Sequence, residues 1–366
     1  MNVAFDASDL CTGRADGTTR YTAELAARLP NIAKDIDWNF YGPCTAPSKP
    51  SVKNWHASPF PAAWTQLRLP IELLRDRPDV LFMPIQQLPI IRPPKTKTIA
   101  VIHDLAFHEY PEQFRYKDWL LLHTFSAQVA KEADAIIAVS EATKKDIEKY
   151  YGRKDSVYVV HHGIDHNRFK VFSEQEKSDG LLRLQAAYPA LQRPYILYVG
   201  QIQPRKNIAS LVAAFEQLGR QDIQLVIAGG HGWHQDDILS RIASSSRKES
   251  IIVPGAVPDD VLPALYANAQ AFILPSLQEG FGIPLIEAAA CGTPLVTSNR
   301  SSMKEIAEEA AVLINPEDAS SIVQGIAEAL TNKTSLSEKS IQLAKRFSWD
   351  TAAKETLRVI QNVASR

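Results

Sequence analysis

Two glutamates eight positions apart, Glu279 and Glu287, enclose a glycine-rich segment with the sequence EGFGIPLIE. The apolar run AFILPS just before it predicts a buried strand, so the segment begins as a loop at the carboxyl end of that strand. Gly280 and Gly282 let the backbone approach a ligand closely, and Pro284 suits the first position of a helix. The N–H groups from Gly280 to Leu285, at the start of that helix, are expected to point outward and predict an anion site, best suited to a phosphate.

The two glutamates flank the expected phosphate position. Because carboxylates repel phosphates, we expect Glu279 and Glu287 to face the uncharged parts of the ligand, and the hydroxyl groups of sugars are good donors to carboxylates. A simpler interpretation is a capped helix with a solvent-exposed glutamate at each end. Glu287 alone fits either interpretation, whereas the glycines and the proline at these spacings favour the ligand site.

A second candidate is the basic pair Arg205 and Lys206, in the segment YVGQIQPRKNIASL. An apolar strand ends at Gly200, and the pair lies in the loop before the next helix. Arginine can bind two phosphate oxygens at once and lysine adds a compact charge, so the pair suits a diphosphate leaving group. The alternative is a solvated basic loop. Asn207 is expected to cap the helix that follows.

Further candidates follow strands in the N-terminal half. The loop TGRADGTTRYTAEL places Gly13 and Gly17 between a short strand and a helix, which is typical of a phosphate-binding turn but lacks the spacing of a dinucleotide fingerprint. In VIHDLAFHEYP, His103 ends an apolar strand, where a histidine is more often simply hydrogen-bonded than functional. We interpret His161 and His162, at a later strand end, as structural.

The elements that position these residues follow one pattern twice. Short apolar runs alternate with helical patterns, which predicts parallel sheets covered on both faces. The length of 366 residues fits two domains. We therefore expect an α/β architecture with two doubly wound, Rossmann-like domains, residues 1–165 and 166–347, facing each other across a cleft, with their ligands outside the carboxyl ends of the strands. The polar stretch 171–193 is expected to be a linker with a poorly defined helix, and 348–366 forms a final helix.

The motif EGFGIPLIE resembles the Glu-x7-Glu motif of retaining glycosyltransferases that use nucleotide sugars and have the GT-B fold. The chain resembles family 4 of these enzymes, the glycosyltransferase group 1 type, over nearly its whole length. The resemblance implies that Glu279 contacts the transferred sugar and Glu287 the ribose, while Arg205 and Lys206 hold the diphosphate. It also implies that domain 166–347 binds the donor, that domain 1–165 faces the acceptor, and that the final helix returns to complete the latter domain.

The resemblance extends to other site residues. His103 is implied to contact the sugar or the acceptor, and it joins Glu279, Arg205 and Lys206 in the catalytic group. The implied donor-binding residues are Gly17, Thr18, Val257, Gly280, Phe281, Gly282, Ile283, Leu285 and Glu287.

The implied reaction moves a hexose from a nucleotide sugar to a glycan or lipid-linked acceptor with retention at the anomeric carbon. The two motifs are most similar to those of mannosyl- and related hexosyltransferases of bacterial surface polysaccharide assembly, so we expect mannose from GDP-mannose. Arg205, Lys206 and the helix N-terminus would stabilise the leaving diphosphate in place of a metal, so we expect no metal and no other cofactor. The Asp-x-Asp triplet at 35–37 precedes a strand and is expected to form a surface turn.

Three other functions remain open. A glycosidase could use Glu279 and Glu287 as an acid and base pair, but a glycosidase has no phosphate for the Arg-Lys pair and the glycine-rich turn to hold. A non-catalytic nucleotide-sugar-binding protein would bind the donor without turnover. A nucleotide-sugar epimerase on a similar fold would need no acceptor.

Composition limits the partners. With 40 Lys and Arg against 41 Asp and Glu, the formal charge is −1 and no basic run stands out, so nucleic acid is not an expected partner. No stretch approaches the ~20 apolar residues of a membrane span, and the N-terminus MNVAFDASDL lacks the features of a signal peptide. The segment 114–125 mixes cations with apolar residues. Peripheral contact with a membrane is one interpretation, and an ordinary core-facing helix is the favoured one.

The three cysteines, Cys11, Cys44 and Cys291, are an odd and widely spaced set. This argues against a disulfide framework or a zinc site and is typical of a reducing cytoplasm. Cys291 is expected to be a small buried residue. We therefore expect a cytoplasmic protein without disulfides, at the inner face of the membrane if segment 114–125 binds lipid.

Overall fold

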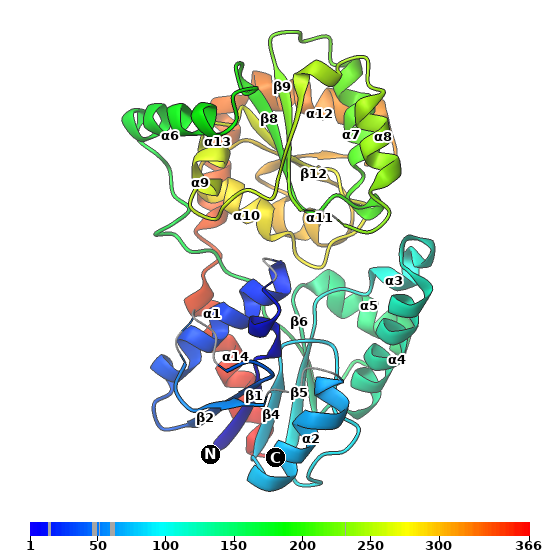
Figure 1. Cartoon of the computed structure of the whole chain (residues 1–366), viewed down its shortest axis with the longest axis vertical. Helices are drawn as coiled ribbons and strands as arrows, with labels where there is room; N and C mark the ends of the chain where they lie inside the picture. The colour runs from blue at the N-terminus through cyan, green and yellow to red at the C-terminus, as the bar shows by residue number, and fades with distance from the viewer. Residues whose placement is uncertain (14–15, 46–49, 51, 59–62, 231) are drawn as a thin grey trace. The chain divides into compact units, whose positions relative to one another are not determined.

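The computed structural model describes residues 1–366 except 14–15, 46–49, 51, 59–62 and 231. The chain folds into two compact units (Figure 1). Unit 1 comprises Met1–Glu109, Tyr116–Gly163 and Trp349–Arg366, and unit 2 comprises Tyr110–Arg115 and Ile164–Ser348. Each unit contains a sheet of parallel strands joined by helices, so the predicted α/β class is confirmed.

In the described residues of unit 1, parallel strands form a 7-stranded sheet in the order β3-β2-β1-β4-β5-β6-β7. The strands are β1 (Asn2–Asp6), β2 (Asp37–Gly42), β3 (Trp55–Ala57), β4 (Val80–Met83), β5 (Lys97–Ile102), β6 (Ala135–Ala138) and β7 (Val157–Val159). The helices are α1 (Gly17–Ile32), α2 (Leu69–Asp76), α3 (Ala106–Glu109), α4 (Tyr116–Glu132), α5 (Glu141–Tyr151) and α14 (Trp349–Ala364), with short helical turns η1 (Ser8–Cys11) and η2 (Trp64–Arg68). Helix α14 packs on α1 and along β4, β5 and β6.

Strands β4 and β6 of unit 1 are buried throughout, and side-chain caps start two of its helices. All residues of β4 and β6 are buried, as expected for strands of a parallel sheet that helices cover on both faces. Helix α1 begins after Asp16, whose carboxylate accepts a hydrogen bond from the Thr19 N–H at 2.9 Å. Helix α5 begins after Ser140, whose hydroxyl accepts one from the Thr143 N–H at 3.0 Å. Such caps satisfy N–H groups that the helix itself cannot bond.

In the described residues of unit 2, parallel strands form a 6-stranded sheet in the order β10-β9-β8-β11-β12-β13. The strands are β8 (Tyr195–Val199), β9 (Gln224–Ala228), β10 (Ile251–Gly255), β11 (Ala271–Leu274), β12 (Leu295–Ser298) and β13 (Ala311–Ile314). The helices are α6 (Glu174–Ala187), α7 (Ile208–Gln217), α8 (Asp236–Ala243), α9 (Leu262–Ala267), α10 (Ile283–Ala290), α11 (Ser301–Ala307), α12 (Ala319–Thr331) and α13 (Lys333–Ala344), with turns η3 (Pro111–Gln113), η4 (Pro204–Lys206) and η5 (Lys248–Ser250).

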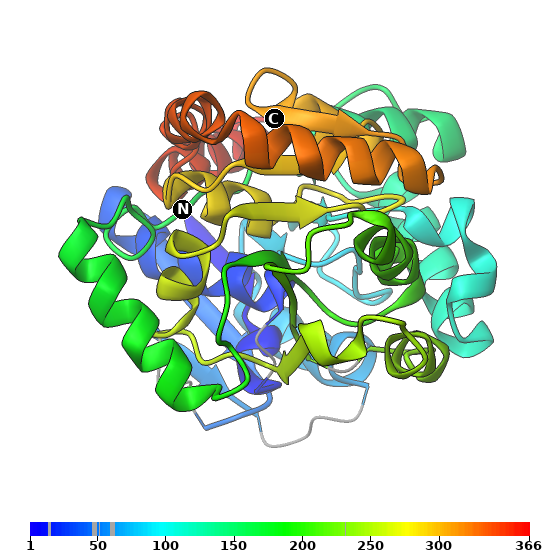
Figure 2. The ribbon, with the colours of Figure 1, turned by 90° about the horizontal axis from the view of Figure 1, so that it is seen from above.

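The polar stretch 171–193 contains a well-formed helix, α6, so the expectation of a poorly defined one is wrong. The Ser173 hydroxyl accepts a hydrogen bond from the Glu176 N–H at 3.2 Å, and the Glu176 carboxylate accepts one from the Ser173 N–H at 2.8 Å. This reciprocal capping box starts the helix. Both views show α6 at the outer edge of unit 2 (Figures 1 and 2), which explains its polar composition.

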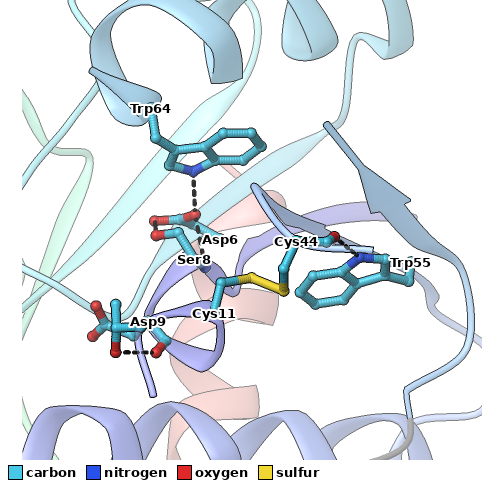
Figure 3. Close-up of a disulfide and its surroundings, with 8 residues drawn as sticks. Asp6, Ser8, Asp9, Cys11, Cys44, Trp55 and Trp64 are labelled. Carbon is cyan, nitrogen blue, oxygen red and sulfur yellow. Dashed lines mark hydrogen bonds between the residues drawn. A yellow bond between two sulfur atoms is a disulfide. The ribbon is translucent and has the colours of Figure 1, made fainter. Parts of the chain in front are cut away.

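A disulfide joins Cys11 to Cys44 (Figure 3), so the expectation of a protein without disulfides is wrong. Cys11 ends the turn after β1, and Cys44 follows β2. Because β1 and β2 are adjacent parallel strands, the segments after them meet at the same edge of the sheet. Their Cα atoms are 5.6 Å apart, within the range of a disulfide. The number and spacing of cysteines carried no information about this strand pairing. Cys291 is a buried thiol, as expected.

In both sheets, the first strand of the unit lies beside a strand from later in the chain. In unit 2, β8 lies between β9 and β11, so the loops after β8 and β11 leave the same edge side by side. In unit 1, the loops after β1 and β4 are neighbours in the same way. Doubly wound sheets bind ligands at such switch points, and most of the candidate residues follow these strands.

Candidate active site

The loops after β8 and β11 bring Arg205, Lys206 and Glu279 together. Arg205 and Lys206 end the turn η4, and Glu279 lies between β11 and α10. The Lys206 ammonium donates a hydrogen bond to the Glu279 carboxylate. Arg205 Nη1 lies 3.3 Å from Glu279 Oε2 and 2.5 Å from the Gln278 carbonyl oxygen. The side chains of Arg205, Lys206 and Glu279 are 12%, 14% and 9% exposed, so the alternative of a solvated basic loop is wrong.

Hydrogen bonds to backbone groups hold the loops after β8 and β11 together. The Leu277 N–H donates to the Arg205 carbonyl at 2.9 Å. The Asn207 side-chain amide donates to the carbonyl oxygens of Pro275 at 3.2 Å and Pro316 at 2.6 Å. Asn207 occupies the N-cap position of α7, but its φ of 58° is left-handed and its side chain makes no capping bond. The expected capping role is therefore wrong, and Asn207 ties the loops together instead.

Glu279 is a buried carboxylate held by cations. The residue is 8% exposed, and the Ser276 hydroxyl donates to Glu279 Oε1 at 2.7 Å. Burial alone would raise the pKa of Glu279, but the charges of Lys206 and Arg205, with hydrogen bonds from Lys206 and Ser276, outweigh burial and lower the pKa below its ordinary value. Burial and then the charge of Glu279 raise the pKa of Tyr198 well above its usual range. The site therefore holds an ionised carboxylate against two cations.

Two serines hold the backbone of Glu279. Ser301 and Ser302 are the first residues of α11, and their hydroxyls donate to the Glu279 carbonyl oxygen at 2.6 Å and 2.9 Å. Ser302 is completely buried. Because β12 lies next to β11, the loop after β12 reaches the loop that carries Glu279. Nothing in the sequence around the two serines indicates this role, since it depends on that strand order.

The turn into α10 is made by Gly282, whose φ of 90° favours glycine. Helix α10 begins at Ile283, with Pro284 as its second residue. The Leu285 N–H donates to the Gly282 carbonyl at 2.9 Å, and the Leu285 side chain is completely buried. The expectation that the Leu285 N–H faces a ligand is therefore wrong, because the turn itself uses that group.

The other residues of the turn pack into unit 2. The Phe281 ring is 3% exposed and meets the Phe347 ring edge to face, with centroids 5.6 Å apart. Gly280 is buried and Ile283 is 9% exposed. The buried side chains of Phe281 and Ile283 hold the turn in place, so any ligand contact of this turn comes through its backbone.

Glu287, on α10, is also buried rather than solvent-exposed. It is 2% exposed, and the Tyr266 hydroxyl donates to Glu287 Oε2 at 2.9 Å. The Tyr266 ring is held by Phe169 and Phe272, with centroids 6.0 Å and 5.5 Å away. The alternative of a helix with a solvent glutamate at each end is therefore wrong for both glutamates. Tyr266 is a functional candidate that only the structure reveals, since nothing near it in the sequence marks a partner for Glu287.

In unit 1, His103 is an oriented imidazole. Its Nε2 lies 2.8 Å from the carbonyl oxygen of Pro84, the residue after β4. A carbonyl only accepts, so Nε2 carries the proton, and Nδ1 is an acceptor in the neutral ring. Burial lowers the pKa of His103, which favours that neutral form.

Buried aromatic rings surround His103. The Tyr21 ring meets the His103 ring edge to face at 5.1 Å, and the His162 ring stacks on His103 at 5.6 Å and 10°. Trp349 of α14 lies 5.6 Å from His162. His162 is 4% exposed, and burial, followed by the neighbouring His103 and His161, holds its pKa well below the usual range. His162 is thus a neutral core ring, in agreement with its predicted structural role.

The remaining candidates occupy helix starts and loops. Gly17 and Thr18 open α1, and the Thr18 carbonyl accepts a hydrogen bond from the Thr22 hydroxyl at 3.0 Å. Two positions of the same loop, 14 and 15, lie outside the described residues. Val257 is partly exposed in the loop after β10. Gly17, Thr18 and His103 therefore belong to unit 1, and the other predicted site residues belong to unit 2.

Across the described ranges, no group of three or more His, Cys, Asp or Glu side chains is placed to hold a metal ion. In the Asp-x-Asp triplet at 35–37, Asp35 and Ile36 lie in the turn before β2, as predicted, and Asp37 is the first residue of β2. Of the helices that the structure describes, none has the length and apolar character needed to cross a bilayer.

Comparison with known proteins covers both units. The family model described as glycosyl transferases group 1 matches residues 185–347, and the one described as glycosyltransferase family 4 matches residues 15–168. The chain is 29% identical over 272 residues to O-antigen chain mannosyltransferase B of Escherichia coli, covering 71% of this chain and 69% of the relative. It is also 29% identical over 268 residues, 70% of this chain, to the serotype-specific mannosyltransferase WbdA of Escherichia coli, and it spans only 32% of that longer relative.

Among solved structures, HepE of Anabaena in complex with UDP-glucose is similar with a TM-score of 0.76 and 17% identity, covering 100% of both chains. At this identity the likeness shows the fold alone. The two family models identify the family of the chain, because they match consecutive parts that together make up most of it. The chain belongs to glycosyltransferase family 4, of the group 1 type, and is a glycosyltransferase with the GT-B fold.

Proposed function

We propose that this glycosyltransferase moves a hexose, mannose from GDP-mannose, onto a glycan or lipid-linked acceptor with retention at the anomeric carbon and without a metal. The observation that carries the proposal is the buried contact of the Glu279 carboxylate with the cations of Arg205 and Lys206. A carboxylate for sugar hydroxyls and two cations for a diphosphate are thereby placed within one hydrogen bond of each other. This is the arrangement that a sugar diphosphate needs on either side of its scissile bond.

In the proposed reaction the charges exchange partners. Without donor, Glu279 neutralises Arg205 and Lys206. When the donor binds, the two cations pair with the phosphate oxygens, because the diphosphate is a stronger anion than the Glu279 carboxylate. Glu279 then accepts hydrogen bonds from sugar hydroxyls. As the bond between the anomeric carbon and the phosphate oxygen breaks, negative charge grows on the diphosphate, and the two cations stabilise it. The acceptor oxygen bonds the anomeric carbon on the same face, and its proton passes to the leaving phosphate.

Other residues complete this proposal. Glu287, fixed by Tyr266, binds the ribose hydroxyls of the nucleotide, while Val257, Gly17, Thr18 and the turn around Gly282 provide further donor contacts. The imidazole of His103 offers Nδ1 as an acceptor for a sugar or acceptor hydroxyl, since Nε2–H is used by Pro84.

The choice of sugar and acceptor rests on relatives. The names of the two Escherichia coli relatives, mannosyltransferases of which one acts on an O-antigen chain, support mannose and a surface polysaccharide acceptor. HepE was solved with UDP-glucose, so a UDP-hexose is the competing donor. We propose a cytoplasmic site of action with peripheral contact to the membrane on the family likeness alone, because the Cys11–Cys44 disulfide removes the argument from cysteine usage.

The test is turnover of a donor panel that includes GDP-mannose and UDP-glucose, with EDTA present, for the wild type and Glu279→Gln. Release of nucleoside diphosphate and transfer to a mannose oligosaccharide are measured, and NMR identifies the anomeric configuration of the product. We expect GDP-mannose to be used, retention, and loss of turnover in the variant. Tight donor binding without turnover would indicate a binding protein, and epimerised donor without acceptor would indicate an epimerase.

A further inference from the structure

A continuous helical segment, η2 followed by α2, turns large apolar side chains toward solvent. Leu67, Ile71 and Leu74 are 61%, 54% and 45% exposed. Their spacing of four and three places them along one side of the helical segment. Leu69 and Leu73 on another side are completely buried. The segment therefore packs on unit 1 through one stripe and presents a second apolar stripe outward.

The loop between β4 and β5 extends this exposed surface. Ile90 and Ile91 are 69% and 59% exposed. Gln66 fixes the loop beside η2, because its side-chain amide donates to the Leu88 carbonyl at 2.9 Å and its side-chain oxygen accepts from the Ile90 N–H at 3.1 Å. The loop and the helical segment thus form one surface, here called the apolar patch, which consists of Leu67, Ile71, Leu74, Ile90 and Ile91.

The charges of the two segments that carry the apolar patch are mostly positive. In residues 64–79 and 84–96 the carboxylates are Glu72, Asp76 and Asp79, and the cations are Arg68, Arg75, Arg77, Arg92 and Lys95. Glu72 is only 3% exposed and is bonded by Arg68 and Arg75. Asp76 accepts hydrogen bonds from Arg75 and from the Tyr41 hydroxyl. Glu72 and Asp76 are therefore held by neighbouring side chains, whereas Asp79 is exposed and accepts a hydrogen bond from the Asn2 N–H at 2.7 Å.

Three of the five cations reach the solvent, whereas the Arg68 and Arg92 side chains are 34% and 19% exposed and pair with Glu72 and Glu132. The Arg75 side chain is 60% exposed, and Arg77 and Lys95 are exposed. A surface of aliphatic side chains with exposed cations at its border complements the boundary between the acyl chains and the anionic headgroups of a lipid bilayer.

We propose that the apolar patch is the surface with which this enzyme docks on a membrane that contains anionic lipid. The aliphatic side chains enter the outer acyl region, and the cations lie at the level of the phosphates. The proposal depends on the apolar patch and not on the transfer chemistry. It gives the proposed lipid-linked acceptor a surface at which unit 1 would meet it.

A second copy of the chain is a poorer occupant. A stable protein interface uses roughly 20–30 residues on each side, and the apolar patch has the five side chains named above. A two-fold contact would also bring the same patch together with itself, so the exposed cations would face their own copies. A bilayer needs few inserted side chains and attracts the same cations.

Another exposed apolar surface on unit 1 provides a matched control. Leu120 and Leu121 of α4 are 44% and 46% exposed, and they belong to the segment 114–125 in which the sequence raised membrane contact. The same segment exposes the cations Arg115 and Lys117, the carboxylate Asp118 and the Tyr116 ring, which is 76% exposed. It offers two exposed aliphatic side chains against the five of the apolar patch, so the proposal expects it to contribute little.

The experiment is vesicle sedimentation of the full chain with phosphatidylcholine alone and with an equal mixture of phosphatidylcholine and phosphatidylglycerol. We expect the wild type to bind the mixed vesicles. Added salt should weaken this binding, and vesicles of phosphatidylcholine alone should bind less protein. Ile71→Ser/Ile90→Ser should lower the partition constant by about tenfold or more, and Leu120→Ser/Leu121→Ser should leave it within a factor of about two. All four positions are exposed, so folding should survive, and donor turnover without vesicles should stay at the wild-type rate.

Several outcomes would overturn the proposal. These are a wild type that stays in solution with the mixed vesicles, equal losses in the two double variants, or binding that does not change in Arg77→Gln/Lys95→Gln. A dimer in light scattering that Ile71→Ser/Ile90→Ser dissolves would assign the apolar patch to a second copy instead. Because donor turnover is measured separately, an enzyme that fails to turn over any donor but binds vesicles through the patch would contradict only the proposed function.

Discussion

The Glu279 carboxylate accepts a hydrogen bond from the Lys206 ammonium, although the two residues are 73 positions apart in the chain. They meet because β8 and β11 are adjacent in the sheet, so the loops that follow these strands leave it side by side. The same contact means that a bound diphosphate has to compete with Glu279 for the cations. Glu279 therefore opposes the binding of one part of the donor while it is expected to hold another.

That competition predicts opposite effects of Glu279→Gln on binding and on turnover. The neutral amide no longer competes for Arg205 and Lys206, so the Kd of the nucleoside diphosphate should fall or stay equal. The turnover of the donor should fall by about 10²–10³, because a group that acts in the transition state is lost. Isothermal titration with GDP and UDP gives the first quantity, and initial rates give the second. Glu308→Gln, at an exposed acid of unit 2, is the control and should change neither. If Glu279→Gln weakened nucleotide binding as well as turnover, the competition between Glu279 and the diphosphate would be contradicted.

The pH dependence of stability follows from the same carboxylate. The folded-state pKa of Glu279 lies below its ordinary value of 4.5, so its ionised form stabilises the fold. This contribution is fully present above pH 4.5 and is lost as the pH falls through the lower, folded-state pKa. Thermal unfolding between pH 7 and pH 3 should therefore show a smaller decrease of Tm below pH 4.5 in Glu279→Gln than in the wild type. Parallel curves over this range would show that the cations do not lower that pKa.

Ser302→Ala should affect catalysis more than its stability cost suggests. The hydroxyl is one of two that hold the Glu279 carbonyl, so its removal should lower kcat by about tenfold and the free energy of unfolding by about 1 kcal/mol. Ser340→Ala is a matched control, since Ser340 is equally buried and donates to the Leu336 carbonyl at 2.8 Å, on α13. It should cost similar stability and leave kcat unchanged. Equal effects on kcat would mean that Ser302 supports only the fold.

Tyr266→Phe tests whether the orientation of Glu287 matters for the nucleotide. The change removes only the hydroxyl that donates to Glu287, so the Kd for GDP should rise by about tenfold, at a net cost of roughly one hydrogen bond to a charged group. The Kd for inorganic pyrophosphate, which has no ribose, should not change. Tyr195→Phe removes a comparable buried hydrogen bond, to the Leu265 carbonyl at 2.7 Å, and should alter neither constant. A rise in both Kd values for Tyr266→Phe would show a general loss of structure.

The disulfide predicts a redox-dependent stability. Cys11 and Cys44 are 33 positions apart, and closing a loop of this size in the unfolded chain stabilises the native state by roughly 3–4 kcal/mol. Cys11→Ser/Cys44→Ser should lower the free energy of urea unfolding by about that amount. Treatment with dithiothreitol should do the same to the wild type and nothing further to the variant. Mass spectrometry under non-reducing conditions checks the bond directly, and two free thiols in the purified wild type would contradict it.

The sequence was a good guide to local structure. The apolar runs predicted the strands of both sheets except β3, whose sequence WHA is not an apolar run. The spacing of glycine and proline in EGFGIPLIE predicted a loop that turns into a helix, as Gly282 and α10 show. These features depend on residues close together in the chain. The capping box that starts α6 is just as local, and the polar composition of the stretch obscured it.

What escaped prediction depends on strand order. Ser302 reaches Glu279 because β12 lies beside β11, and Cys11 reaches Cys44 because β2 lies beside β1. Neither neighbour is specified by the residues around these positions. The Leu285 N–H was misassigned for a different reason, since the tight turn at Gly282 uses a donor that an idealised helix start would leave exposed.

The place of α14 has a consequence for the order in which the protein is made. Trp349 packs against Tyr21 and His162, and α14 lies on α1 and the central strands of unit 1. On the ribosome, unit 2 is finished before this helix emerges, although unit 1 began first. Domains fold as units during synthesis, so unit 1 has to wait, incomplete, until the helix that closes it has been translated. The aromatic cluster around His103 is therefore among the last parts of the enzyme to form.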